Sequence, residues 1–593
     1  MEDCTGQYVS ISKMITALHK NTDLIKQLLS LDKMKDTDTL TNFFDGAFWR
    51  RHPLRGEQCL VIRLYGDDFE PCNPLGARKT LYKIGAIYYQ FEGLPVFLQS
   101  KLENIFLALC YYTDDCKTCG WENVLKPLIN ELQLLAAEGL SLSTADGIIC
   151  VRVVISCVTG DNLFLNGILG FVESFSARYP CRHCVVPRCK FSETFSECSS
   201  RLRTVTSYDK DAENIDVSTT GIKMPSPLNA ISYFHAAENF VQDIMHDVLE
   251  GVCQYDMMLI VNHLVSLQGL SLERINGLVE HFSYGRHDIS NKPVKLTEAS
   301  LKCDMLPMNA SQSWCFTRVL SLAVGFIVPE DDNVWLLYLT LRQILDILFA
   351  SEVEIGELKL LEVLIAEYLE MHTVLFPHVT LKNKHHHLTH YPRLILEVGP
   401  LHRLWCMRFE SKHLRSKKVM QMSCNFKNIP LTTASRHQYD VANRMLSNSD
   451  YRADAKLGAG TVTVLSELTA GEEISACMNN IGLHFELYSC TVAELGGISY
   501  SCGCYLLSDI SDDEPQFAKL WYIFSREQGQ YIWFICVRLQ TLGFCEHLHA
   551  WKVRIPEERY YVSVDPRHLK YAVPLSLHYV GNESFIAGLR SRL

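Results

Sequence analysis

This sequence has no uncharged apolar run that is long enough to cross a membrane. Its most apolar helical segment, VWLLYLTLRQILDILFA at 334–350, carries Arg342, Gln343 and Asp346, whereas a membrane-spanning helix needs about 20 predominantly apolar residues. The N-terminal MEDCTGQYVSISKM has neither the basic nor the apolar region of a signal peptide. We therefore expect a protein that is not secreted and has no membrane partner. Its expected location is the nucleus, with the cytosol as the alternative.

The sequence also has no excess of positive charge. Its 56 lysines and arginines are outnumbered by 67 aspartates and glutamates, which gives a formal net charge of −11. This balance argues against a protein that coats nucleic acid non-specifically, but it does not exclude a local basic channel. Internal repeats and low-complexity segments are missing, and residues 1–55 contain no complete zinc-finger spacing. This short helical and polar lead-in shows no sequence-specific DNA-binding module.

What is present describes an ordinary globular protein of several domains. A chain of 593 residues is too long for one core, and two to four domains are expected. The hydrophobic content of 48% and the charged content of 21% supply ample material for a core. Because no secretory signal accompanies them, the 23 cysteines are expected to be reduced thiols and metal ligands rather than disulfides.

Residues 56–185 are expected to form three strands, a helix and a fourth strand. QCLVIRLYG and two later apolar segments have strand-like composition, WENVLKPLINELQLLAAEG has helical periodicity, and GIICVRVVISCVTGD is typical of a strand buried on both faces. Asp67 and Asp68 end the first strand, and Asp161 follows the fourth. This is the order of an RNase H-like fold, in which those two strands lie side by side and their aspartates can share divalent metal ions. Both aspartates follow a glycine, so ordinary turn residues are the alternative interpretation.

Two short motifs, far apart in the chain, have the composition of a zinc site. Cys181 and Cys184 form a C-x2-C pair with polar and basic flanks, which favours metal ligands over buried thiols, the alternative in a cysteine-rich chain. In KHHHLTH, His386 and His390, or His385 and His390, have the separation that lets two imidazoles face one metal. The spacing leaves open which histidine of the run is the ligand.

Glu410 lies in a predicted helix that is rich in basic side chains. A carboxylate in this setting is either a salt-bridged surface residue or an acid held next to a polyanion. Asp243 and His246 lie on another predicted helix, where a structural histidine is the alternative to a ligand. The basic residues around Glu410 are Arg408, Lys412, Arg415, Lys417 and Lys418. The expected apolar residues of the same helix are Leu404, Met407, Leu414 and Val419.

The remaining segments complete the expected domain organisation. A loop at 186–225 is followed by an all-α insertion at 226–380, and residues 381–437, with the histidines and Glu410, complete the core. Residues 438–593 alternate apolar and polar residues between turn signals, as is typical of a small antiparallel β domain with a barrel-like form. The predicted fold class is therefore α/β, with an RNase H-like catalytic core, an all-α insertion and a C-terminal antiparallel β domain.

In this order, the motifs resemble those of the DDE transposases of the CACTA (En/Spm) group. The zinc-ligand pattern is similar to that of the RAG recombinase catalytic subunit, and the resemblance covers most of residues 58–437. Twenty residues separate Asp161 from Cys181 and twenty separate His390 from Glu410, which is similar to the spacing in that group. The segments that carry the resemblance are GDDFEPCNPLG, TGDN, YPCRHC, QDIMHDVLEGVC, KHHHLTHYP and GPLHRLWCMRFESKHLRSKK.

The resemblance implies a catalytic role for three acids. Asp67, Asp161 and Glu410 match the catalytic carboxylates, with Asp68 as the rival for the first position. They imply two Mg²⁺ ions and the metal-dependent cleavage and transfer of DNA strands. The basic residues around Glu410 are expected to contact phosphates without reading the base sequence. Asp243 and His246 match a D-x2-H signature of the group, to which no role is assigned.

The resemblance also implies one structural Zn²⁺ and a set of partners. Its ligands match Cys181, Cys184, His386 and His390, with His385 as the alternative to His386. The expected partners are transposon ends, target DNA and further copies of the chain in a homo-oligomer. Because the lead-in is short, the alternative is a catalytically inactive, domesticated nuclear scaffold that binds DNA or protein and retains the zinc-stabilised fold. A zinc-containing scaffold unrelated to DNA is a third hypothesis.

Overall fold

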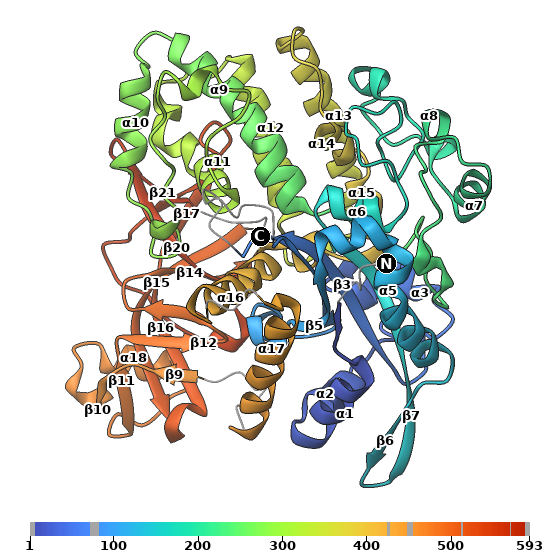
Figure 1. The fold of residues 1–593 in the computed structure, drawn as a ribbon. Coiled ribbons are helices and arrows are strands. Elements are labelled where there is room, and N and C mark those ends of the chain that lie inside the picture. Colours follow the sequence, from blue (N-terminus) through green and yellow to red (C-terminus); the bar gives the residue numbers. More distant parts are fainter. Residues whose placement is uncertain are drawn as a thin grey trace. The chain divides into compact units, whose positions relative to one another are not determined.

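The chain has a mixed α/β fold, seen in a computed structural model (Figure 1). It divides into two compact units, which are described separately: Met1–Gly251 with Ser351–Tyr451, and Val252–Ala350 with Arg452–Leu593. No helix among the described residues is long and apolar enough to span a membrane. The residues that the structure describes are 6–71, 82–423, 427–447, 455–511, 514–569 and 571–587.

The first unit is built on a six-stranded mixed sheet with the order β1-β5-β4-β3-β7-β6. Its central pair, β3 and β7, is parallel, and every other neighbouring pair is antiparallel. The carboxyl ends of β3 and β7 therefore lie at the same edge of the sheet. The strands are β1 (Gln7–Tyr8), β3 (Cys59–Phe69), β4 (Ile84–Phe91), β5 (Phe106–Tyr112), β6 (Leu140–Thr144) and β7 (Gly147–Gly160).

The predicted order of three strands, a helix and a further strand is found at β3, β4, β5, α5 (Thr113–Ala137) and β7. Helix α5 starts earlier than its apolar periodicity indicated and contains a kink at Gly120, whose φ of 77° lies outside the helical region. Strand β6 was not predicted. It forms a hairpin with β7 through a tight turn that pairs Thr144 with Gly147.

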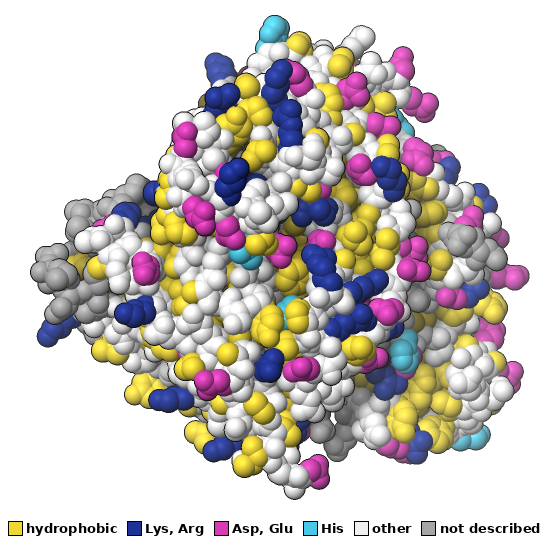
Figure 2. Space-filling view, turned by 90° about the vertical axis from the view of Figure 1, so that its right-hand side faces the viewer, with side chains coloured by type: hydrophobic (Ala, Val, Ile, Leu, Met, Phe, Trp, Pro, Cys, Tyr) yellow, Lys and Arg dark blue, Asp and Glu magenta, His cyan; other side chains and the backbone are white. Residues whose placement is uncertain are grey.

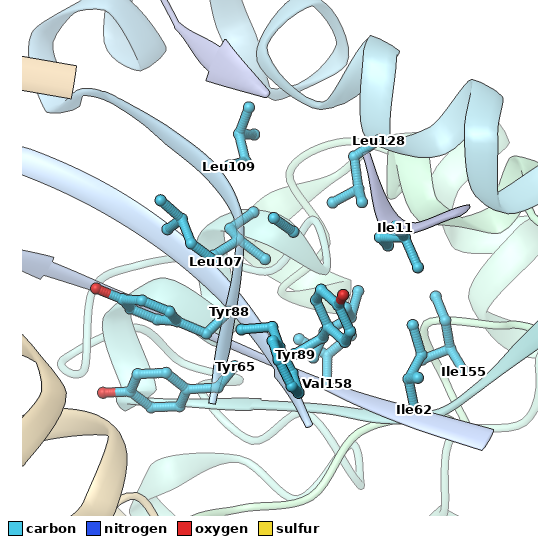
Figure 3. Packing of buried hydrophobic residues seen from close by; sticks show 14 of the residues in the cluster. Ile11, Ile62, Tyr65, Tyr88, Tyr89, Leu107, Leu109, Leu128, Ile155 and Val158 are labelled. Atoms are coloured by element: carbon cyan, nitrogen blue, oxygen red, sulfur yellow. The ribbon is translucent and has the colours of Figure 1, made fainter. Parts of the chain in front are cut away.

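The sheet is covered by apolar side chains that form one large core. Strand β4 is buried along its whole length, and β7 is buried from Val153 to its end, as its uninterrupted apolar run predicted. Figure 3 shows residues of β3, β4, β5 and β7 packed together with Ile11 and Leu128, which come from helices α1 (Ile11–Asn21) and α5. Burial of each such side chain contributes roughly 1.5–3 kcal/mol. The core therefore holds the carboxyl ends of β3 and β7 rigidly.

Residues 6–55 belong to this core and do not form a separate lead-in. Strand β1 pairs with β5, and Ile11 and Ile15 of α1 are fully buried. The chain continues through α2 (Leu24–Leu29) and α3 (Ala47–Arg50), where Trp49 is also fully buried. Strand β2 (Thr39–Leu40) pairs with β8 (Val353–Glu354) of the same unit.

Two helical segments complete the first unit, one following β7 and one following residue 351. Helix α17 crosses the boundary that the sequence placed between residues 437 and 438, because its buried face packs on β5. The elements of the first segment are α6 (Asn162–Ile168), α7 (Val205–Glu213), α8 (Val217–Thr220) and the π-helix η6 (Met245–Val252). Those of the second are α13 (Glu357–Leu375), α14 (Asn383–Leu388), α15 (Tyr391–Val398), α16 (Met407–Ser423) and α17 (Ile429–Leu446).

The second unit combines helices from the middle of the chain with a C-terminal antiparallel β region. The helices predicted for 226–380 are present, but those before residue 350 and those after it belong to different units. The helices of the second unit are α9 (Cys253–Ser266), α10 (Leu272–Glu280), α11 (Ala310–Val324), α12 (Asn333–Leu348) and α18 (Gly471–Cys477). Its strands, which pair only antiparallel among the described residues, are β9 (Ala455–Leu457), β10 (Gly460–Val464), β11 (Glu486–Cys490), β12 (Val492–Leu495), β13 (Ile498–Ser501), β14 (Tyr505–Ser511), β15 (Glu514–Arg526), β16 (Tyr531–Arg538), β17 (Gln540–Cys545), β18 (Ala550–Arg554), β19 (Tyr561–Val564), β20 (Tyr571–Val580) and β21 (Glu583–Ala587).

The cysteines are mostly reduced, as expected. Nineteen of the described cysteines carry free thiols, whereas Cys119 is disulfide-bonded.

On the face drawn in Figure 2, acidic and basic side chains are interspersed, in keeping with the modest negative net charge.

Candidate functional site

Two of the predicted acids lie side by side at the carboxyl ends of the parallel strands β3 and β7. Gly66 of β3 is in register with Gly160 of β7, so Asp67 and Asp161 are the next residues on adjacent strands. A Cβ atom on Gly66 would lie 1.8 Å from the ring of Phe164, and one on Gly160 would lie 2.6 Å from the Gly66 carbonyl oxygen. Glycine is therefore required at both positions for packing, and this packing brings the two aspartates to one edge of the sheet.

Asp161 marks the change from strand β7 to helix α6. It is the N-cap of α6, and its Oδ1 accepts a hydrogen bond of 2.6 Å from the Phe164 backbone N–H. Aspartate is among the preferred N-cap residues because it satisfies a free amide of the first helical turn. One carboxylate oxygen of Asp161, Oδ1, therefore has a local structural role as the helix cap. The other, Oδ2, makes no hydrogen bond to another of the described residues.

Asp67 and Asp68 have different surroundings. Burial, together with the negative charge of Asp161, raises the pKa of Asp67 to about 7. Asp68 forms an ion pair with Lys83, with 3.2 Å between Oδ2 and Nζ. Among the described residues Asp67 has no lysine or arginine partner, although the nearby His246 acts to lower its pKa, whereas Asp68 is already paired with Lys83. The part of the GDDFEPCNPLG motif beyond residue 71 lies outside the described residues.

Glu410, on helix α16, reaches the same neighbourhood. Its negative charge contributes to the raised pKa of Asp67, as does that of Asp161. Its side chain is 39% exposed, and its Oε1 lies 3.1 Å from His246 Nε2. The three acids come from β3, the end of β7 and α16, but they are not among the groups of described residues whose ligand atoms all lie within 4.8 Å of one another.

His246 links Glu410 to Asp243 on the opposite side of its ring. Its Nδ1 lies 2.6 Å from Asp243 Oδ2. Burial opposes the charged imidazole, but the hydrogen bonds to Asp243 and Glu410 raise the pKa of His246 well above its usual value. Asp243 Oδ1 accepts from the backbone N–H of Cys406 and of Met245, at 3.0 and 3.2 Å. Although Asp243, His246 and Cys406 form a compact group, these contacts are those of a hydrogen-bonded chain that orients Glu410.

His413 is a residue of this site that the sequence did not single out. It lies one turn after Glu410 on α16, with Nδ1 3.5 Å from Asp67 Oδ2, and its ring stacks on Phe69. Burial lowers the pKa of His413 to about 3, so the ring is neutral. The signal that could have found it is the E-x2-H spacing, which puts Glu410 and His413 on one face of a helix.

A second site brings together Cys181, Cys184, His386 and His390, all of them buried. Cys184 Sγ lies 3.1 Å from His386 Nε2, and Cys181 Sγ lies 3.4 Å from His390 Nε2. Ligands of one tetrahedral Zn²⁺ have sulfur–nitrogen separations of about 3.5 Å, given Zn–S and Zn–N bonds of about 2.3 and 2.0 Å. The four side chains therefore have the spacing and the chemistry to hold a zinc-like metal ion.

The structure distinguishes the three consecutive histidines. His386 faces the cysteines, whereas His385 Nδ1 accepts a hydrogen bond from the Lys382 backbone N–H and His387 Nδ1 lies 2.7 Å from Asp247 Oδ2. The alternative ligand His385 is thus wrong, because α14 turns it to the start of the helix. Consecutive helical residues point about 100° apart, so one residue of the three can face the metal position.

The surroundings of this group support a bound cation. Although burial opposes it, hydrogen bonding with Cys184 and the charge of His390 hold the pKa of the Cys181 thiol well below its usual range. The thiolate is the form that binds metals. His390 Nδ1 lies 2.5 Å from Glu197 Oε2, and Arg393 holds the other oxygen of Glu197 at 2.8 Å. A carboxylate on the outer nitrogen of a ligating histidine is the usual means of fixing its ring.

The basic residues of α16 divide into two groups. Arg408, Arg415 and Lys418 are exposed and Lys417 is half-buried, and Arg415 forms an ion pair of 3.0 Å with Asp440. The prediction that Lys412 contacts phosphates is wrong, because this side chain is only 6% exposed and its Nζ donates to the Leu102 carbonyl at 2.9 Å. It therefore packs α16 against the core and does not belong to the predicted DNA surface.

The chain matches no protein-family model. A search of curated proteins found none that matches it. Its function is therefore inferred from its own residues.

Proposed function

We propose that this chain is a DDE-type transposase, similar to the CACTA group, that cleaves and transfers DNA strands in a metal-dependent reaction. The observation that carries the proposal is the placement of Asp67 and Asp161 at the carboxyl ends of two adjacent parallel strands, together with the negative charge of Glu410, which raises the pKa of Asp67 as that of Asp161 does. Like charges that act on one another raise each other's pKa, and a bound cation would relieve that repulsion.

We further propose that the sheet is an RNase H-like core. Support comes from the order β5-β4-β3-β7, with three antiparallel strands and a parallel fourth beside the first. In such a core the acids lie at the carboxyl ends of the first and fourth strands; here Asp67 lies near the end of β3 and Asp161 follows β7. Helix α16 would supply the third acid after a long insertion.

The acidic group is suited to hard divalent cations. The pKa of about 7 for Asp67 reflects burial and the negative charges of Asp161 and Glu410, which outweigh the opposing charge of His246. A bound Mg²⁺ would relieve this repulsion through the oxygen ligands that it prefers. The chemistry that two bound Mg²⁺ ions would supply is activation of a water or a DNA 3′-hydroxyl and stabilisation of the leaving oxygen. Asp67, Asp161 Oδ2 and Glu410 would hold them, and His246 would orient Glu410. The exposed basic residues of α16 would position the phosphate backbone.

The second site would hold one structural Zn²⁺. Two thiolates and two imidazoles complete a tetrahedral shell and leave no position for a substrate, which is typical of structural rather than catalytic zinc. Cys181 and Cys184 follow β7, and His386 and His390 precede α16. The metal would thus join the segment after Asp161 to the segment before Glu410. In this proposal the partners are transposon ends and target DNA, the protein acts as a homo-oligomer, and its location is the nucleus.

An inactive, domesticated scaffold is the second candidate, and one observation favours it. The first 55 residues, as far as they are described, pack into the core through β1, Ile11 and Trp49 rather than forming a module that could recognise transposon ends. Such a protein would bind DNA or protein through the same fold without cleaving a strand.

Nicking of supercoiled DNA separates the two candidates. With Mg²⁺ or Mn²⁺, the wild type is expected to nick the DNA, and Asp161→Ala and Glu410→Gln are expected to lose at least a hundredfold in rate. Asp68→Asn is the matched control, because Asp68 is neutralised by Lys83, and it should keep most of the activity. Binding without nicking in the wild type would support the scaffold. Equal activity in the wild type and Glu410→Gln would refute the assignment of the acids.

A further inference from the structure

Asn162, the residue next to Asp161, is held by hydrogen bonds from two directions. Arg182 donates to its side-chain Oδ1 at 2.7 Å and to its backbone carbonyl at 3.3 Å. On the other side, Asn162 Nδ2 donates to Asp247 Oδ1 at 2.6 Å. Both carbonyl oxygens and the amide of Asn162 are thus used, which fixes the side chain and the backbone together.

Each of these contacts leads to one half of the Cys181–Cys184–His386–His390 group. Arg182 lies within the C-x2-C motif and is 1% exposed. Asp247 is fully buried, and its second oxygen, Oδ2, lies 2.7 Å from Nδ1 of His387, the neighbour of His386. The cysteine half therefore reaches Asn162 through Arg182, and the histidine half reaches it through His387 and Asp247.

The hydrogen bonds that Asn162 makes with Arg182 and Asp247 are strong and directional. Hydrogen bonds to a guanidinium or a carboxylate are about twice as strong as those between neutral groups, and the planar fork of arginine fixes direction as well as distance. Removing one partner from a buried group of hydrogen-bonded charged side chains leaves the charge of another without compensation. A shift of either motif must therefore move Asn162 or break a charged contact.

The position of Asp161 depends on that of Asn162, because Asp161 is the N-cap of α6 and Asn162 is the first residue of the same helix. Asp161 Oδ1 is fixed by the Phe164 N–H, and the backbone of Asn162 lies between them. The orientation of the free Oδ2 is thus determined by the first turn of α6, which Asn162 anchors.

We propose that Asn162 couples the Cys2His2 metal site to Asp161, with Arg182 and Asp247 as positioning residues. Metal binding joins the two motifs, the joined motifs hold Asn162 from both sides, and Asn162 sets the first turn of α6. The consequence for catalysis rests on the proposed function, whereas the coupling itself does not.

Hydrogen exchange measured with and without zinc tests the coupling without DNA or Mg²⁺. Removal of zinc with 1,10-phenanthroline from the wild type is expected to accelerate amide exchange at 162–168 about tenfold, and added Zn²⁺ should restore it. In Asn162→Leu, exchange there should be fast already and insensitive to the chelator, while one zinc per chain is retained. Strand β5 should keep its protection in both proteins.

Asn166→Ala is the matched control variant. Arg182 also donates to Asn166 Oδ1, in the same helix, so this variant removes a partner of Arg182 but leaves Asn162 held. It should keep the response to the chelator. Equal responses in wild type and Asn162→Leu, equal loss of protection in β5, or absence of bound zinc in the wild type would overturn the proposal. If the response is as expected but the wild type does not nick DNA, the coupling stands and the proposed function fails.

Discussion

Replacing the buried Lys412 by methionine should stabilise the protein at neutral pH. Burial lowers the pKa of Lys412 from 10.5 to about 8, which corresponds to a penalty of about 3 kcal/mol for keeping the ammonium group charged. Loss of the hydrogen bond to the Leu102 carbonyl costs about 1–3 kcal/mol, because that acceptor is left unpaired. The net expectation for Lys412→Met is a gain of about 1 kcal/mol at pH 7.

The sign of this difference should reverse at high pH. Between pH 8 and 10.5 the unfolded chain keeps the lysine proton and the folded protein releases it, so the stability of the wild type rises by about 1.4 kcal/mol per pH unit. At pH 10 the wild type no longer carries the buried charge but still has its hydrogen bond. Lys412→Met should then be the less stable protein, by about 1 kcal/mol or more.

Urea denaturation of both proteins at pH 7, 8.5 and 10 measures the effect. Lys418→Met is the matched control, because Lys418 lies on the same helix but is exposed. It should change stability by less than about 0.5 kcal/mol and weaken DNA binding, whereas Lys412→Met should leave DNA binding unchanged. A stability difference for Lys412→Met that is the same at pH 7 and pH 10 would refute the reasoning, because charge burial could not be its cause.

Two further predictions concern the metal site and Asp67. Glu197→Gln should weaken zinc binding tenfold to a hundredfold, because Glu197 orients His390. Competition with a chromogenic chelator measures this affinity. The control is Glu193→Gln, since Glu193 is exposed and pairs with Lys190, and equal losses in both variants would contradict the role of Glu197. Without added divalent cations, folding stability should fall by up to about 1.4 kcal/mol per pH unit from pH 4 to 7, because folded Asp67 keeps its proton to about pH 7 and the unfolded chain releases it near 3.8. Asp67→Asn should remove this dependence, and denaturation curves that shift in parallel with pH in both proteins would count against it.

Sequence patterns were sufficient wherever a local rule determines the result. The uninterrupted apolar run of β7 predicted a strand buried on both faces, and β7 is such a strand from Val153 onward. The C-x2-C and H-x3/4-H spacings pointed to Cys181, Cys184 and His390, with His386 or His385 as the fourth residue, because each pair lies within one or two turns of chain. The missed strand β6 had a signal of this local kind, since Asp-Gly at 146–147 between alternating segments favours a hairpin.

The choice between neighbouring residues needed three-dimensional information. His385 and His386 differ only in the direction that α14 gives them, and that direction depends on where the helix begins. Lys412 was predicted to contact phosphates, but it is buried on α16. The periodicity of Phe409, Lys412 and His413 would have placed Lys412 on the buried side, and Leu414 is 58% exposed.

The contacts between distant segments had no signal in the sequence. Asn162 and Asp247 are separated by 85 residues, and the pairing of His246 with Glu410 spans even more of the chain. Asparagine, arginine and aspartate are common surface residues, so their composition does not reveal that they are buried together. They come into contact because Asp247 of η6 lies between Asn162 at the start of α6 and His387 of α14.

The π-helix η6 has a consequence for how this chain can tolerate changes in length. A π-helical turn contains one residue more than an α-helical turn, and here consecutive residues, His246 and Asp247, contact Glu410 and Asn162 respectively. Deleting one residue between 248 and 252 would relax the segment towards an ordinary α-helix and remove the wide turn from which His246 and Asp247 reach these two partners. The length of this segment is therefore expected to be constrained as well as its composition, since Val248, Leu249 and Val252 are fully buried.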